Sequence, residues 1–238
     1  MNRQVFVFLC AVLALEISSI EAKDISPRDL IEQAREQLEQ LKDIIQGDIS
    51  AAHDQLANLK TDFSTNVNVI VSTGTVDIEQ EHDLIIGQID TLEELAHTAG
   101  QDVSSCVEVR EQVLNRLPGE FIAEMRQCTG DLEKEVARVI NDAIYIVDVN
   151  INKVHTLENQ LDRCGNNILC VTPIVSEIQL DMIRLPQDIK TEVQAAESLV
   201  TIVKISAQQC SDVKVSEYAS RANSIFADIA ACINRIIG

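Results

Sequence analysis

The chain has 238 residues, of which 46% are hydrophobic but only 3% aromatic, and its formal net charge at pH 7 is −19. So acidic a surface repels phosphate backbones, which argues against nucleic acid as a partner, and the scarcity of aromatic side chains argues against an apolar ligand pocket. With eight glycines and four prolines, the composition is typical of long helices.

The first 22 residues predict a secretory signal peptide. One early cation, Arg3, precedes an apolar run from Val5 to Leu15 that is short for a membrane span, and Ala22 is a suitable last residue before cleavage. Cleavage removes one of 19 basic and two of 38 acidic residues, which leaves 18 and 36 and a net charge of −18. No later apolar stretch approaches about 18 residues. We therefore expect a soluble, secreted, extracellular protein without stable membrane insertion.

Residues 23–100 form the first predicted helical segment. Ser26 can cap a helix and Pro27 fits its first turn. Apolar residues then recur through residues 27–63 in steps of three and four, which predicts an amphipathic helix. Such a stripe must pack against another helix. We expect the stripe to be exposed and to support self-association through residues 27–63.

A weaker stretch and a module boundary follow. Residues 66–75 are the poorest helix formers of the segment, because β-branched residues surround Gly74. Gly100, followed by Asp102, predicts a helix end and a fresh cap. The boundary is placed there, because every cysteine after the signal peptide lies in residues 101–238.

Residues 101–238 form a predicted cysteine-containing helical domain whose cysteine spacings read almost the same from either end. The steps are 22, 36, 6, 40 and 22 residues. An even cysteine count in an exported chain favours disulfides over free thiols. The six residues are Cys106, Cys128, Cys164, Cys170, Cys210 and Cys232.

The spacing predicts a ladder of bridges across an antiparallel helical hairpin. At 1.5 Å per residue, the two arms from the turn at residues 165–167 measure about 54 and about 60 Å, and a disulfide needs Cα atoms within about 7 Å. The predicted pairs are Cys106–Cys232, Cys128–Cys210 and Cys164–Cys170. The alternative joins Cys106 to Cys128 and leaves Cys210 to pair with Cys232, which stand about 33 Å apart on an unbroken helix.

Together these features predict an all-α fold. It is an elongated bundle of long antiparallel amphipathic helices whose C-terminal part is stapled by disulfides. Thr172 and Pro173 are expected to restart a helix after the turn, and Pro186 to kink that helix or cap a restart.

Residues 148–152 resemble the first half of a calcium-binding loop. Lys153 stands where glycine is needed, and Asn159 where a bidentate glutamate is expected. A polar helix face is the better interpretation of this segment.

Two short acidic and histidine clusters could hold a weak metal ion. They are Glu81-His82-Asp83 and the pair Glu93 and His97, but the histidines of the chain are scattered and no zincin motif is present. No phosphate loop or nucleophile elbow appears either. We predict no catalytic residue, no cofactor-binding residue and no metal site, and hence a protein that is not an enzyme.

The layout resembles the insect secreted TsetseEP-domain family, a domain of unknown function found in cysteine-containing helical proteins. The likeness rests on Cys106, the step to Cys128, the close pair Cys164 and Cys170, and then Cys210 and Cys232. It covers residues 101–238. The resemblance implies an insect secreted protein of gut or reproductive fluid with no catalytic site. The acidic Glu-Pro tail of the tsetse protein is absent here.

The leading functional hypothesis is a secreted, non-enzymatic helical protein that acts through surface interactions, as a gut, immune or body-fluid component. The alternative is a carrier of lipid or another small apolar ligand, because amphipathic helices with few aromatic residues can open around cargo. Disulfides within residues 106–232 oppose such opening, whereas residues 23–100 carry no bridge.

Overall fold

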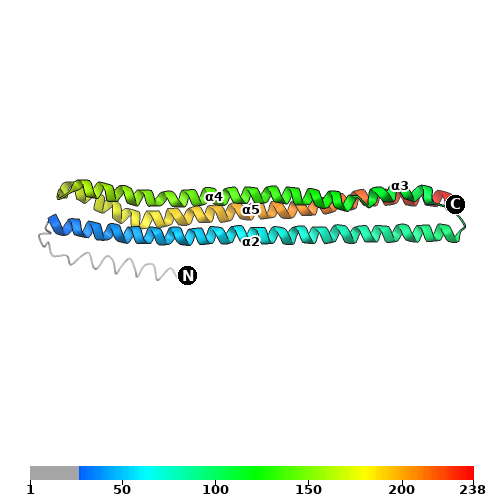
Figure 1. The fold of residues 1–238 in the computed structure, drawn as a ribbon, viewed down its shortest axis with the longest axis horizontal. Coiled ribbons are helices and arrows are strands. Elements are labelled where there is room, and N and C mark those ends of the chain that lie inside the picture. Colours follow the sequence, from blue (N-terminus) through cyan, green and yellow to red (C-terminus); the bar gives the residue numbers. More distant parts are fainter. Residues whose placement is uncertain (1–26) are drawn as a thin grey trace, which may run out of the picture. The chain divides into compact units, whose positions relative to one another are not determined.

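The structure of the protein is a computed structural model that describes residues 27–238, and every element within them is a helix (Figure 1). The helices are α2 (Pro27–Thr98), α3 (Ser104–Leu114), α4 (Leu117–Cys164) and α5 (Ile168–Ile237). The predicted all-α class and the long helices are confirmed. The predicted signal peptide, residues 1–22, and the predicted cap at Ser26 lie outside the described residues.

The chain divides into two compact units, and three helices contribute to both. Among the described residues, the first unit contains 27–48 and 148–188, and the second contains 49–147 and 189–238. This division cuts across the boundary predicted near residue 100. Residues 49–98 of α2 share a unit with α3 and with parts of α4 and α5, because an amphipathic helix must bury its apolar face against other helices.

Contacts within the second unit fix the helix directions. Ser64 Oγ of α2 donates a hydrogen bond to Glu133 Oε1 of α4 over 2.9 Å, and Gly74, later in α2, lies beside Met125, earlier in α4. These two helices are therefore antiparallel. Gly74 also lies beside Ser211 of α5, and His82 beside Tyr218, so that α2 and α5 run in the same direction.

The apolar stripe of residues 27–63 is not exposed. Most of its members are buried by the chain itself, which leaves no free stripe for another copy of the protein. The expected self-association through residues 27–63 is therefore wrong in its premise. The buried members are Ile31, Ala34, Leu38, Leu41 and Ile45 in the first unit and Ala52, Leu56 and Phe63 in the second.

Helix α2 continues without a break through the weak stretch at residues 66–75. Val67 and Ile70 are buried, so tertiary packing outweighs their low helix propensity. A Cβ atom built on Gly74 would lie 2.7 Å from Met125 Sδ and even closer to Ser211 Oγ. Glycine thus allows the backbone of α2 to approach α4 and α5 closely.

Prolines mark one helix boundary but not another. Pro118 is the second residue of α4, where its missing N–H group costs no helical hydrogen bond. Helix α5 begins at Ile168, four residues earlier than the restart expected at Thr172. It contains both Pro173 and Pro186 without ending at either.

Candidate functional sites: a disulfide framework and an acidic hollow

The disulfides of the structure join the same cysteines as the predicted ladder. In the second unit, Cys106 is bonded to Cys232 and Cys128 to Cys210, with Cα–Cα distances of 5.7 and 6.7 Å. They tie α3 and α4 to α5. In the first unit, Cys164 and Cys170 close the α4–α5 turn, with their Cα atoms 5.5 Å apart and Gly165 at a φ of 52°. The alternative bond between Cys106 and Cys128 is not formed.

Cys106 belongs to a continuous apolar core in the second unit. Tyr218 is the largest of its fully buried side chains, and its ring meets that of Phe121 edge-on, with centroids 5.9 Å apart. The remaining buried members come from all four helices and from Val103, directly before α3. They are Ile78, Ile85, Ile89, Ala96, Val103, Val107, Leu114, Leu117, Met125, Ala222, Ile229 and Ile233.

The segment Glu81-His82-Asp83 contributes contacts between helices. His82 Nδ1 lies 3.2 Å from the hydroxyl oxygen of Tyr218, and Asn223 Nδ2 donates to Glu81 Oε1 over 3.1 Å. Burial, with the negative charges of Glu81 and Asp83, raises the pKa of Tyr218 to about 12. Like that of an ordinary tyrosine, the phenol is protonated at neutral pH and can donate to His82.

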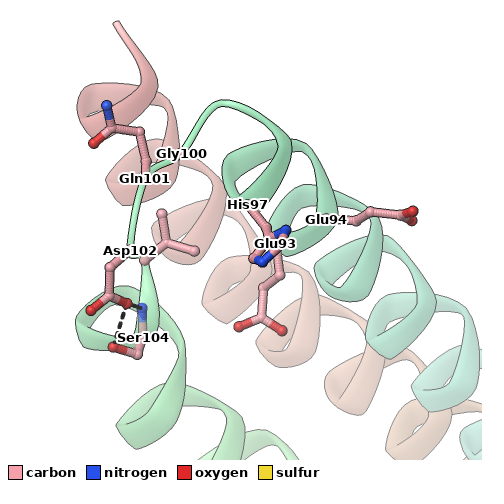
Figure 2. Close-up of a pocket in the computed structure, with 8 residues that line it drawn as sticks. Glu93, Glu94, His97, Gly100, Gln101, Asp102 and Ser104 are labelled. Carbon is pink, nitrogen blue, oxygen red and sulfur yellow. Dashed lines mark hydrogen bonds between the residues drawn. The ribbon is translucent and has the colours of Figure 1, made fainter.

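An open hollow of about 690 Å³ lies where the chain turns from α2 into α3 (Figure 2). Gly100, at a φ of 72°, makes the turn. Its N–H donates to the carbonyl of His97, and the N–H of Gln101 donates to that of Ala96. This pair of bonds is a Schellman motif, which satisfies the last carbonyls of α2. The predicted helix end at Gly100 is confirmed.

The carboxylate of Asp102 organises the start of α3. Its Oδ1 accepts bonds from the backbone N–H of Ser104 over 3.0 Å and from the Ser104 hydroxyl over 2.8 Å. These hydrogen bonds lower the pKa of Asp102. The N-cap residue of α3 is nevertheless Val103, which makes no side-chain capping bond, so the cap predicted at Asp102 is one residue too early.

The pKa of a second carboxyl group in the hollow is shifted in the opposite direction. Burial, followed by the negative charges of Glu111 and Asp90, raises the pKa of Glu93. In Figure 2, Glu93 and His97 come from the end of α2, whereas Asp102 lies beside Ser104 at the start of α3. The hollow thus offers a carboxyl group of raised pKa and an imidazole on an open surface, where both can form hydrogen bonds with a partner.

Neither predicted metal candidate forms a site with three or more suitable ligands. No such group of histidine, cysteine, aspartate or glutamate side chains occurs within residues 27–238. The segment that resembles a calcium loop, residues 148–159, lies inside helix α4 and is not a loop.

Sequence reasoning missed a buried carboxyl group, Asp181 of α5. It lies in the first unit among buried residues spaced as one helical stripe, Ile174, Ile178 and Leu185. Nearby, Lys153 of α4 forms an ion pair with Glu177 of α5. The steps of four, three and four residues along the stripe were the available signal, because they place an acid where an apolar residue is expected.

None of the helices formed by residues 27–238 has the length and apolar character that crossing a membrane requires. Compared with models of protein families and with curated proteins, the chain matches none.

Proposed function

We propose that this chain is a secreted, non-enzymatic helical protein that acts through its surface, as the resemblance to the TsetseEP-domain family implies. The observation that carries the proposal is the pairing of all six cysteines of residues 23–238 in three disulfides. Disulfides form and persist in oxidising environments such as the secretory pathway and extracellular fluid.

The packing of the second unit supports action through the surface. One cluster of its buried apolar residues is shared by all four helices, and two disulfides hold α3 and α4 against α5. Its hollow at the α2–α3 turn is open to solvent and exposes polar and apolar surface in nearly equal amounts. Recognition by outward-facing side chains fits this arrangement better than enclosure of a substrate.

Export of the full chain from a eukaryotic secretory cell tests the proposal. We expect the protein in the medium, with a mass that lacks residues 1–22 and is lower, by the six hydrogens of three disulfides, than that of the reduced protein. Retention inside the cell or free thiols in the exported protein would contradict it. So would saturable turnover of any substrate that is lost in Glu93→Gln or His97→Ala.

The alternative, a carrier of small apolar ligands, predicts a different result from the same material. Native mass spectrometry of the exported protein should show its bare polypeptide mass if it acts through its surface. A carrier would retain lipid from the producing cell. To hold lipid in the second unit, the helices would have to part against the bridges Cys106–Cys232 and Cys128–Cys210.

A further inference from the structure

Helix α5 presents an apolar surface to solvent within the second unit. Leu199, Ile202 and Ile205 are 49%, 60% and 55% exposed, respectively. With Ser198 and Ser206 they occupy an arc of about 120° on the helix, opposite the residues that α5 buries. We call these five residues the α5 outer face.

The α5 outer face is uncharged in a strongly acidic chain. From Gln194 to Ser211 the only charged residues are Glu197 and Lys204, which cancel, whereas the whole chain has a net charge of −19. A basic partner would be attracted to the acidic parts of the surface and not to this face. A partner that is itself acidic meets the least repulsion here.

The apolar and serine positions of the α5 outer face are also symmetric about Ile202. Leu199 and Ile205 lie three residues before and after Ile202, and Ser198 and Ser206 lie four residues before and after it. When two copies of such a helix pair antiparallel about a twofold axis at the central residue, each residue meets its counterpart. Leu199 of one copy then packs on Ile205 of the other, and Ile202 packs on itself.

We propose that the α5 outer face binds a second copy of this chain through an antiparallel twofold contact centred on Ile202. The inference deepens the proposed function by naming a partner for the surface. Three apolar side chains cover much less than the roughly 800 Å² per partner of a standard interface, so the dimer is weak and forms at high protein concentration. Such concentrations are those of an abundant fluid component.

Sedimentation equilibrium of the exported, disulfide-bonded protein tests the contact, from about 10 µM to about 1 mM, the range that brackets weak association. The wild type should show a monomer–dimer equilibrium. Ile202→Glu places two carboxylates face to face and should raise the dissociation constant at least about tenfold. The matched control is Val69→Glu, because Val69 is 60% exposed on α2 of the same unit. It should leave the equilibrium unchanged.

Charge pairing then tests the twofold geometry. Ile202→Lys alone should dissociate like Ile202→Glu, but a mixture of the two variants should form a heterodimer, since residue 202 faces itself. A monomeric wild type at the highest concentration, an equal effect of Val69→Glu, or the absence of a heterodimer would each overturn the proposal. A monomeric protein that is still exported with three disulfides would leave the proposed function standing.

Discussion

Asp181 is 3% exposed, and its Oδ2 has no hydrogen-bond partner among the described residues. Burial is the largest cause that raises its pKa, and Glu177 and Asp188 of α5 add to the rise. Lys153 of α4 and Arg184 of α5 oppose it. The folded protein therefore holds this proton more tightly than the unfolded chain does. The resulting stabilisation is complete below the unfolded pKa and is lost as pH rises through the folded pKa.

Replacing this carboxyl group by an amide should change the pH dependence of stability. We expect Asp181→Asn to raise the free energy of unfolding by about 1–2 kcal/mol at pH 7, because the buried ionised group is removed. This increase in the free energy of unfolding should shrink towards zero as the pH falls to the ordinary pKa of an aspartate. Urea unfolding between pH 4 and pH 8 measures it.

Asp162→Asn is the matched control for Asp181→Asn. Asp162 belongs to the same unit but is largely exposed, and its Oδ1 lies 3.8 Å from Arg35 Nη2. An exposed ion pair contributes roughly 0–1 kcal/mol, so this variant should change stability little at any pH in the series. A loss of stability in Asp181→Asn at pH 7 would show that the carboxylate is better satisfied than its burial indicates.

Gly74 and Gly87 lie in the same helix and the same unit but in opposite surroundings. A Cβ atom on Gly87 would have nothing within 4 Å, whereas one on Gly74 would overlap Ser211 and Met125. Gly87→Ala should therefore stabilise the protein by about 0.5–1 kcal/mol through helix propensity alone. Gly74→Ala should destabilise it by about 1–3 kcal/mol, because overpacking outweighs the same gain. Thermal unfolding of the two variants measures the difference. Equal stabilisation of both would show that α4 and α5 can move to accommodate the added methyl group at residue 74.

At the scale of elements, sequence periodicity identified the helices well but not their partners. The stripe of residues 27–63 predicted a helix that must pack, yet nothing in its own sequence shows that α4 and α5 bury it. Residues 66–75 are weak in isolation and helical in the fold, because burial of Val67 and Ile70 depends on other helices. The close approach at Gly74 depends on the register of three helices, which no single segment encodes.

The spacing of the cysteines predicted which helices lie side by side, whereas the apolar periodicity did not. The near-symmetry of the steps predicted the three pairs found in the structure, because a covalent bond requires matching heights on two helices. Polar contacts within the helices lack such a constraint. The bond between Ser64 and Glu133 and the hollow beside Glu93 follow from the fold and had no comparable signal.

The bridges should differ in their contribution to stability according to the loops that they close. Cys106 and Cys232 are 126 residues apart, but the inner bridge Cys128–Cys210 shortens the path between them to about 44 residues. Replacing both outer cysteines by serine should cost about 4 kcal/mol, against about 2 kcal/mol for the six-residue step Cys164–Cys170. Urea unfolding of the two double variants measures the difference, and equal losses would contradict an origin in chain entropy.

For the whole molecule, the excess of 38 acidic over 19 basic residues opposes compaction. Salt screens this repulsion, because the Debye length falls from about 30 Å at 0.01 M to about 8 Å at 0.15 M. We therefore expect the free energy of unfolding in urea at pH 7 to rise with NaCl, on the order of 1 kcal/mol over this range. The same series at pH 4.5, the isoelectric point of the sequence, is the control and should be nearly flat.

A fall in the free energy of unfolding with salt at pH 7 would contradict this prediction. It would mean that contacts such as that of Lys214 Nζ with Glu124 Oε2, 2.8 Å apart, outweigh the net repulsion. Choline chloride in place of NaCl should give the same curve, since screening does not depend on which cation supplies the ionic strength.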